Sequence, residues 1–361
     1  MFGLREFKML FNLKYISSLT KYLIFLTSIS IFLIFCDSNG SEYTGPWKEV
    51  PTPGGEGQLN ACYFTSSDNG WACGWTWNEE EQRSYPLLIH WNGTEWEEYP
   101  YGGWFDNEQF IGIIISDISF SSPDDGWCVG NVAISHYENF GFILRYDGSN
   151  WYLFKSHFEE AIYDVYCISK NDIWFIVGEI NNGDVLYHWD GSDIKRCDTS
   201  PNNPGLYDIA FSSSNEGLAV GNYYSVYHWD GTSWTEIDSD PSRPYVNNAV
   251  SYYEQNKSFI VGEERMATWI NNEYKYYYQW HYFYNDINFS SAYEGWIIGY
   301  RPIGGGHGTP TAWNWNGEKW EEIDCPDYMR GNSVFSINEN EAWIVGTYRN
   351  AYCSSWRYIP Q

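Results

Sequence analysis

Arginine side chains are concentrated in irregular segments of this 361-residue chain, and their chemistry suits ligand binding. A guanidinium offers planar N–H donors that match the oxygens of a carboxylate or sulfate, so several arginines on one surface predict a site for an acidic ligand. The ordinary alternative is that exposed loops simply carry charge. The predicted ligand-binding arginines are Arg83, Arg265, Arg301, Arg330 and Arg349.

Aromatic residues share the same segments. Exposed rings beside polar groups suit the faces of sugars or the surface of a protein partner. Because Phe, Trp and Tyr make up 20% of the chain, some rings fall in loops by chance alone. We expect the ligand-binding rings to include Trp104, Trp280 and Tyr348, and Trp77 is among the other loop aromatics.

Four aspartates recur at the start of the same predicted strand in different repeats, and these are Asp117, Asp164, Asp208 and Asp286. Carboxylate oxygens suit calcium, which makes calcium the one metal to consider at these residues. We favour the alternative that each carboxylate accepts backbone hydrogen bonds from the neighbouring repeat, since buried carboxylates must be paired. We expect no other cofactor.

All of these residues belong to a sequence repeat that recurs along the chain. Its first signature is a short apolar strand that ends in Gly, and its second is an Asn-Gly or Asp-Gly pair flanked by aromatic residues. The strand-ending glycines recur roughly every 45 residues, a period typical of propeller blades. They are Gly74, Gly130, Gly178, Gly221, Gly262, Gly299 and Gly346. The flanked pairs are Asn92-Gly93, Asp147-Gly148, Asp190-Gly191, Asp230-Gly231 and Asn316-Gly317, and the fifth repeat has Asn271-Asn272 instead.

Each repeat predicts four short antiparallel strands in a meander, named A to D here, without alternating helices. Asp230-Gly231 predicts a type I′ turn, in which both central residues have positive φ. The last repeat lacks a strand D, and Trp47–Val50 resembles the missing strand. Pairing of this strand with the last repeat removes exposed sheet edges. We therefore predict an all-β fold, a seven-bladed β-propeller of four-stranded antiparallel blades over residues 46–361, closed by the N-terminal strand.

The meander separates two faces. The A–B and C–D turns are short, polar and similar in every repeat, which indicates a structural role. The B–C and D–A connections on the opposite face are long and different in every repeat. Variable loops on a rigid scaffold commonly carry function, and all five predicted arginines lie in these loops, so we expect the site there.

The repeats resemble those of BNR-type propellers, which occur in sialidases, cell-surface glycan-binding proteins and photosystem II assembly factors. The likeness covers nearly all of the chain after residue 45. The sialidase Asp-box has Ser-x-Asp-x-Gly-x-Thr-Trp at the C–D turn. The segment HWDGTSW keeps Gly231 and Trp234 but has Trp229 where the box has its Asp. The resemblance implies a propeller scaffold, and its sialidase members imply an acidic sugar as substrate.

The first 36 residues form a distinct leader. A basic segment precedes the apolar run 22–35, which is short for a membrane span and suits a signal sequence. The run ends in LIFC, which resembles a bacterial lipobox with Cys36 as the acylated residue, although Phe35 replaces the usual small residue. A cleaved secretory peptide and an uncleaved anchor are the alternatives. We predict a leader 1–36, a linker 37–45 and a propeller 46–361 in an exported protein, either a lipoprotein at the cell envelope or secreted.

Charge narrows the choice of partners. The formal net charge of −27 argues against nucleic acid and against docking on an anionic membrane, because both depend on Lys and Arg. We expect membrane association only through the lipid anchor or the leader. The seven cysteines after Cys36 form no CxxC motif, and we expect most of them to be buried as small apolar residues.

Three functions remain open. We favour a non-enzymatic binding protein that holds a glycan or protein ligand in its B–C and D–A loops. The second is a sialidase-like glycoside hydrolase or lyase acting on acidic glycans. Such an enzyme needs an acid/base pair beside the arginines, and no motif identifies one, so we predict no catalytic residue. The third is an assembly scaffold for a membrane complex.

Overall fold

The computed structural model describes residues 43–105, 109–135, 138–179, 183–197, 205–304, 307–348 and 352–360. The regular secondary structure within these ranges is entirely β-strand, as the sequence predicts, and residues from Thr44 onward belong to one compact unit. The described part contains no helix able to cross a membrane. The predicted leader with Cys36 lies outside the described residues.

The repeats are numbered 1 to 7 along the chain. Repeats 1 and 2 contain β2 (Gly57–Ser66), β3 (Asn69–Asn78), β4 (Arg83–Trp91), β5 (Trp96–Glu98), β6 (Gly112–Ser122), β7 (Asp125–Ala133), β8 (Asn139–Tyr146) and β9 (Trp151–Phe158). Repeats 3 and 4 contain β10 (Ile162–Ser169), β11 (Asp172–Glu179), β12 (Gly183–Trp189), β13 (Ile194–Cys197), β14 (Leu206–Ser213), β15 (Glu216–Gly221), β16 (Val226–Trp229) and β17 (Trp234–Asp238). Repeats 5 and 6 contain β18 (Asn247–Glu254), β19 (Lys257–Ile270), β20 (Glu273–Ser291), β21 (Glu294–Gly304), β22 (His307–Trp315) and β23 (Trp320–Ile323). Repeat 7 contains β24 (Met329–Asn338), β25 (Glu341–Tyr348) and β26 (Tyr352–Tyr358), and β1 (Trp47–Val50) precedes all of them.

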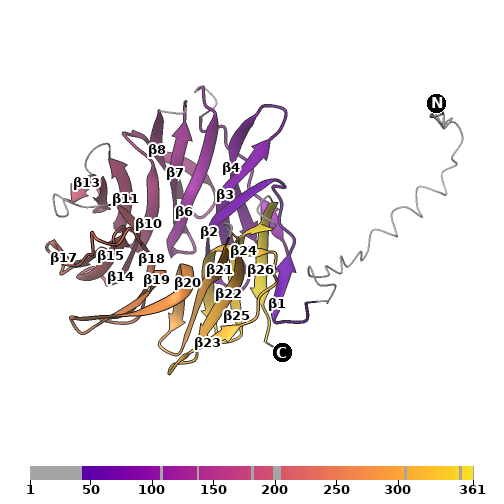
Figure 1. Ribbon diagram of the computed structural model, residues 1–361. Coiled ribbons are helices and arrows are strands. Elements are labelled where there is room, and N and C mark those ends of the chain that lie inside the picture. The colour runs from indigo at the N-terminus through magenta and orange to yellow at the C-terminus, as the bar shows by residue number, and fades with distance from the viewer. Residues whose placement is uncertain are drawn as a thin grey trace, which may run out of the picture. The chain divides into compact units, whose positions relative to one another are not determined.

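Strands that follow one another in a repeat pair antiparallel (Figure 1). Repeats 3 and 4 form four-stranded sheets in the orders β10-β11-β12-β13 and β14-β15-β16-β17. The sheet of repeat 7 has the order β1-β26-β25-β24, with Trp47 opposite Tyr358 and Val50 opposite Ser355. The N-terminal strand therefore pairs with the last repeat, as the sequence predicts.

Two longer sheets join adjacent repeats. β19 changes partner at Glu264, whose φ is 55°, so that its first half pairs with β18 and its second half with β20. β20 continues into repeat 6 and pairs there with β21. Between repeats 1 and 2, Ser84 on β4 pairs with Gly112 on β6. These links hold neighbouring repeats together through the backbone.

Aromatic rings also join one repeat to the next. The ring on strand B of one repeat meets the ring on strand D of the next repeat edge to face, a favourable arrangement for aromatic pairs. Trp343 and Trp96 have centroids 5.5 Å apart at 83°. The same relation holds for Trp71 with Trp151, Trp174 with Trp234 and Phe259 with Trp320. Trp47 of β1 lies 5.1 Å from Trp296 at 75°, so β1 occupies the place of strand D in repeat 7.

Most described cysteines behave as the sequence predicts. Cys62, Cys73, Cys128 and Cys353 are buried, and Cys167, Cys197 and Cys325 are partly buried. Burial raises the pKa of the Cys73 thiol well above its ordinary value, so this thiol stays protonated and apolar.

The C–D turns on the short-turn face are closed by side-chain caps. Asp230 Oδ1 accepts the backbone N–H groups of Thr232 and Ser233 at 2.8 and 2.9 Å, and the strands pair on either side of the loop 230–233. Within this loop only Gly231 has a positive φ, 91°. The predicted type I′ turn is therefore wrong, because the Asp230 carboxylate organises a longer loop. Hydrogen bonds from the Thr232 hydroxyl and the backbone lower the pKa of Asp230 to about 2.

A type I′ turn does occur in repeat 5, the repeat without the Asp-Gly pair. Asn271 and Asn272 have φ values of 51° and 67°. They join Ile270 and Glu273, which pair directly. Asn adopts the left-handed region more readily than most residues, so two asparagines can form a two-residue turn. The Asp-Gly repeats form a longer, capped loop instead.

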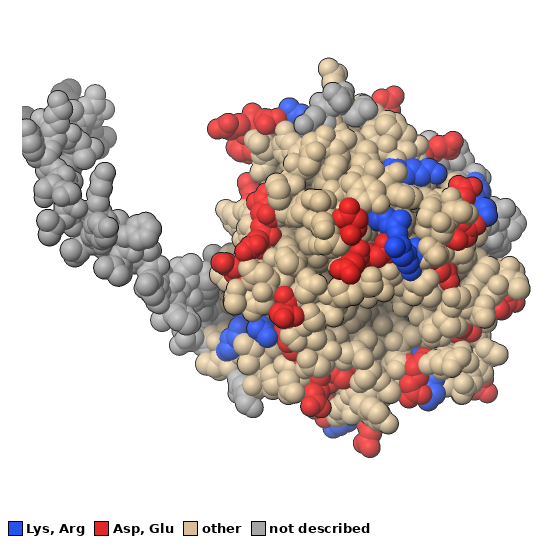
Figure 2. Space-filling model, turned by 180° about the vertical axis from the view of Figure 1, so that it is seen from behind, with Lys and Arg blue, Asp and Glu red and all other residues tan. Residues whose placement is uncertain are grey.

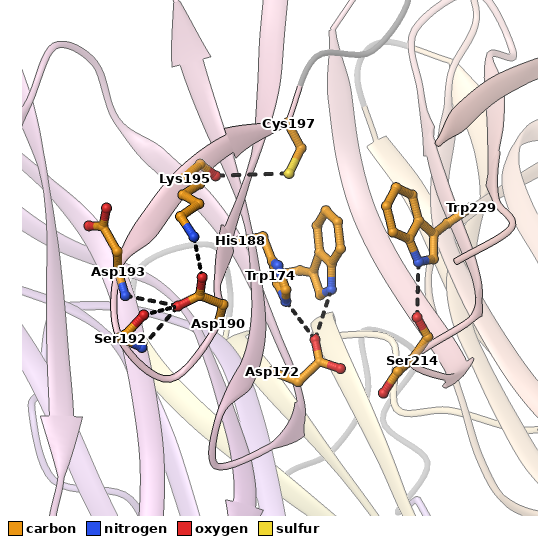
Figure 3. A network of polar contacts seen from close by, with 10 residues as sticks. All are labelled: Asp172, Trp174, His188, Asp190, Ser192, Asp193, Lys195, Cys197, Ser214 and Trp229. Carbon is orange, nitrogen blue, oxygen red and sulfur yellow. Dashed lines mark hydrogen bonds and ion pairs between the residues drawn. The ribbon is translucent and has the colours of Figure 1, made fainter. Parts of the chain in front are cut away.

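A second polar contact recurs on the short-turn face. In Figure 3, Asp172 Oδ1 lies 2.7 Å from His188 Nε2 and accepts the indole N–H of Trp174 at 3.2 Å. The same view shows Asp190 capping its turn and pairing with Lys195. Equivalent contacts between strands B and C join Asn69 to His90, Asp125 to Arg145, Glu216 to His228, Glu294 to Asn314 and Glu341 to Arg357. Polar and charged side chains at the ends of strands B and C therefore stabilise each repeat.

Candidate functional site

The candidate site lies on the loop-rich face, where strands A begin and strands B end. Arg330, near the start of β24, lines a cavity of about 280 Å³. Gln58 of β2, Asn285 and Tyr300 of repeat 6, and Thr347 of β25 line it as well. The cavity therefore collects side chains from repeats 6, 7 and 1.

Arg330 is half-buried and has only backbone carbonyls as hydrogen-bond partners among the described residues, although the charge of Asp327 attracts it. Its Nη1 donates to the carbonyl oxygens of Met329 and Asp327 at 3.0 and 3.2 Å, and it forms no ion pair with any carboxylate in the described residues. Burial lowers the pKa of the guanidinium below its ordinary value, yet an arginine remains protonated at neutral pH. A partly desolvated cation with free donors is well suited to an anionic ligand group.

The cavity at Arg330 continues into two others. Gln58 and Thr347 also line a cavity of about 430 Å³, and Trp77 and Glu79 connect that cavity to a third of about 490 Å³. The three cavities follow one another across the loop-rich face from Arg330 to the hairpin of repeat 1. Such a row suits an extended ligand better than a single compact molecule.

Arg265 does not lie on the exposed surface that the sequence predicts. Its side chain is 2% exposed, and its guanidinium contacts Asp238 and the Tyr274 hydroxyl. The rings of Tyr224 and Tyr276 lie 4.5 and 4.3 Å from its Cζ atom. The prediction of an exposed arginine here is wrong, because the end of β17 and the tyrosines around it enclose the charge. The predicted ligand-binding surface of arginines therefore does not include Arg265.

Two further predicted arginines reach the surface already paired. Arg301 Nη2 lies 3.2 Å from Glu322 Oε1, and Arg83 Nη2 lies 2.7 Å from Glu81 Oε2. Neither lines the cavity at Arg330. Figure 2 shows the same tendency on the face it draws, where Lys and Arg form small separate groups, most of them beside Asp or Glu. The structure thus does not gather the predicted arginines into one cluster.

The remaining predicted site residues differ in their surroundings. Arg349 and the side chain of Trp280 lie outside the described residues. Trp104 packs against the core of repeats 1 and 2, and Tyr348 packs edge to face with Tyr328 at 5.0 Å. Of these residues, Tyr348 is adjacent in sequence to Thr347 of the cavity row.

The recurring aspartates bond neighbouring repeats, as the favoured alternative predicts. Asp117 Oδ2 accepts the Val165 N–H at 3.0 Å, and Asp208 Oδ2 accepts the Val250 N–H at 2.6 Å. Asp164 and Asp286 do the same with Ile209 and Val334. Where this position is not Asp, an Asn amide donates across to a carbonyl, in the pairs Asn60 with Ile115, Asn248 with Tyr284, and Asn332 with Leu59. Polar side chains therefore join each repeat to the next.

The four aspartates line a central cavity of about 270 Å³. Burial raises the pKa of Asp208 to about 8 and that of Asp286 to about 6, and it raises the pKa of Asp164 well above its ordinary value. Among the described residues, no group of three or more His, Cys, Asp or Glu could hold a metal ion. The geometry favours a structural role for these aspartates.

Sequence reasoning missed the importance of the repeat 1 hairpin. Trp77 was one of many loop aromatics, and Glu79 and Glu80 were not singled out. The available signal is their combination, because an acidic run begins two residues after an aromatic residue at the end of strand B. Arg330 was identified, but only the fold shows that it differs from Arg301 and Arg83 in having no carboxylate partner among the described residues.

The sequence matches no known family model, and no curated protein is similar to it in sequence. Its structure is similar to that of YCF48 bound to D1 peptide, with a TM-score of 0.61, 14% identity, and coverage of 89% of this chain and 97% of that one. It is also similar to YCF48 from Cyanidioschyzon merolae, with a TM-score of 0.60, 16% identity, and coverage of 87% and 99%. The WD40 repeats of RRP9 give a TM-score of 0.60 at 8% identity, with coverage of 88% and 100%. These likenesses show the fold, and the chain is a β-propeller.

Proposed function

We propose that this chain is a seven-bladed propeller that binds a protein partner through its loop-rich face. The blade count is supported by the bonds between repeats, which run from repeat 1 to repeat 7 and return from Asn332 to the Leu59 carbonyl at 2.8 Å. Closure by the N-terminal strand is supported by the pairing of β1 with β26. A closed ring protects sheet edges and holds the variable loops rigidly on one side.

The row of three cavities that begins at Arg330 carries the proposal. An extended peptide segment fits such a row, and a carboxylate on that segment offers the partner that Arg330 lacks among the described residues. The carboxylate comes from an Asp or Glu side chain or from a free C-terminus. The fold is shared with YCF48, for which a complex with D1 peptide is known, and this likeness supports a peptide as ligand.

Binding is favoured over hydrolysis by the composition of the cavity at Arg330. Its described lining contains Gln58, Asn285 and Asn332 but neither Asp nor Glu. A sialidase-like glycosidase needs a positioned acid and base or a nucleophile beside the arginine. The amides of Asn285 and Asn332 are instead bonded to backbone carbonyls, which fixes the walls of the cavity.

The cellular setting is part of the proposal. The leader 1–36 exports the chain, and acylation of Cys36 holds the propeller at the envelope surface. Metabolic labelling with a radioactive fatty acid in a bacterial host tests this step. The wild-type protein is expected to incorporate label and the Cys36→Ser variant is not. Label retained in the variant contradicts acylation at Cys36.

A peptide array tests the binding function. We expect the purified protein to bind a subset of peptides that carry a carboxylate, and Arg330→Gln to weaken this binding about tenfold, since a hydrogen bond to a charged group contributes roughly 1.5–3 kcal/mol. Arg301→Gln, which removes a paired arginine from the same face, serves as the matched control. Binding to a glycan array with no peptide binding, or turnover of a fluorogenic sialoside, contradicts the proposal in favour of a glycan-binding or hydrolytic function.

A further inference from the structure

The hairpin between β3 and β4 forms an aromatic groove on the loop-rich face. The Trp77 side chain lines both cavities of the groove, those of about 430 and 490 Å³. Its indole N–H donates to Glu79 Oε2 at 2.9 Å, and its backbone N–H donates to the Glu56 carbonyl at 2.8 Å. These bonds fix the indole between the two cavities.

Aromatic residues form the walls on both sides of this indole. Trp75 lines the smaller cavity, and Tyr85 and Tyr101 line the larger one with ring centroids 6.1 Å apart. Trp77 is half-buried and makes no ring contact with another described aromatic residue. Part of its ring is therefore available to a ligand.

Every charged side chain that lines the groove is a glutamate. Glu56, Glu79, Glu80 and Glu98 are all exposed, and the described lining of the two cavities contains no Lys, Arg or His. The nearby Arg83 is paired with Glu81 and its Cζ atom lies 5.8 Å from the centroid of the Tyr85 ring, but Arg83 does not line either cavity. The groove thus combines aromatic surface with uncompensated negative charge.

We propose that this groove binds a lysine or arginine side chain from a basic segment of the protein partner. Its cation lies over the Trp77 indole and within reach of the Glu79 and Glu80 carboxylates, where cation–π attraction and charge-assisted hydrogen bonds act together. Its aliphatic stem packs along Tyr85. Aromatic walls alone suit many kinds of ligand. Aromatic walls combined with carboxylates favour a cation with an apolar stem.

The inference rests on the proposed function and gives the bound segment a direction. Gln58 and Thr347 connect the groove to the cavity at Arg330. A segment that spans the row therefore places its basic residue at Trp77 and its carboxylate at Arg330. Charges of opposite sign at the two ends fix the register of an extended peptide, since a reversed peptide brings like charges together.

A tetra-arginine peptide with an amidated C-terminus and an uncharged BODIPY label is the probe, and fluorescence anisotropy with the full-length protein at about 0.15 M salt is the measurement. We expect Trp77→Ala and the double variant Glu79→Gln/Glu80→Gln each to weaken binding about tenfold. Trp77→Phe is expected to retain most of the affinity because it keeps an aromatic face. Arg301→Gln, which removes an arginine that lies outside the cavity row, is expected to leave binding of this probe unchanged within about twofold.

The matched control is Glu95→Gln/Glu318→Gln, which changes the net charge equally but lies in the C–D turns of the short-turn face. Equal weakening by the control pair overturns the proposal, because the attraction is then general. Failure of the wild-type protein to bind the probe also overturns it. If the carboxylate-bearing peptides of the array still bind in an Arg330-dependent way, the proposed function stands without the basic subsite. If only the basic probe binds, the groove stands and the site at Arg330 fails.

Discussion

The two faces of the propeller differ in how regularly their charged side chains are paired. On the short-turn face, the same contacts recur from repeat to repeat, as in the caps of Asp190 and Asp230 and the contact between Asp172 and His188. On the loop-rich face, Arg330 has only backbone carbonyls as described partners, and the glutamates near Trp77 line a groove without a cation. Recurring, satisfied charges indicate scaffold, and irregular, unsatisfied charges indicate a place where a partner supplies the missing group.

The largest effect is expected where the N-terminal strand β1 pairs with β26 of the last repeat. Trp47→Ala removes a fully buried ring that packs on Trp296 and Tyr358, and we expect the free energy of unfolding to fall by about 3–5 kcal/mol. Urea unfolding followed by circular dichroism measures the change. Lys48→Ala, on the exposed side of the same strand, is the control with little expected effect. Equal stability of the Trp47 variant contradicts the role of β1 as strand D.

The contribution of the central aspartates to the free energy of unfolding should depend on pH. Burial raises the pKa of Asp208 to about 8 and of Asp286 to about 6. A raised folded-state pKa favours folding while the group is protonated, so this stability is present below about pH 4 and is lost as the pH rises through about 8. We expect the free energy of unfolding to fall by several kcal/mol between these limits, since each unit of pKa shift corresponds to about 1.4 kcal/mol, and to fall less steeply in Asp208→Asn. A profile that rises with pH, or peptide affinity lost in Asp208→Asn, contradicts this assignment.

Arg330→Gln should separate binding from stability. We expect peptide affinity to fall about tenfold with the unfolding midpoint nearly unchanged, because the side chain contributes no ion pair to the fold in its described surroundings. Arg301→Gln, in contrast, should leave affinity within about twofold of wild type. Isothermal titration with one peptide from the array measures both variants. Equal losses in the two variants indicate general attraction by the face instead of a site.

The smallest effect is expected at a turn cap. Asp230→Ala removes the acceptor for two backbone N–H groups in the loop 230–233, and it should destabilise the protein by about 1 kcal/mol without changing peptide affinity. Urea unfolding and titration calorimetry give the two quantities. Weaker peptide binding by this variant implies that the short-turn face takes part in function, which breaks the distinction between the faces.

Much of the scaffold could be predicted from the sequence because local signals repeat. The Gly-terminated strands, the match of Trp47–Val50 to strand D and the bonding role of Asp117 all follow from period and position. The turn at Asp230 could not be predicted in detail, since a carboxylate cap and a type I′ turn share the Asp-Gly pair. The tight turn instead uses Asn271-Asn272.

The site was less predictable because it depends on contacts between distant repeats. Arg265 and Arg301 occupy similar sequence positions, yet Asp238 and Tyr224 enclose the first and Glu322 pairs with the second. Loops that differ in every repeat determine whether an arginine has a carboxylate partner. No periodic sequence pattern predicts this pairing. The same holds for Trp77, whose groove is completed by other segments of repeats 1 and 7.

Hydrogen–deuterium exchange with and without a bound array peptide tests the central claim most directly. We predict slower exchange in residues 56–58, 76–80 and 329–332, which line the row of cavities, with the turns 92–95 and 230–233 unchanged. Slower exchange in those turns, with no change along the cavity row, contradicts the assignment of function to the loop-rich face.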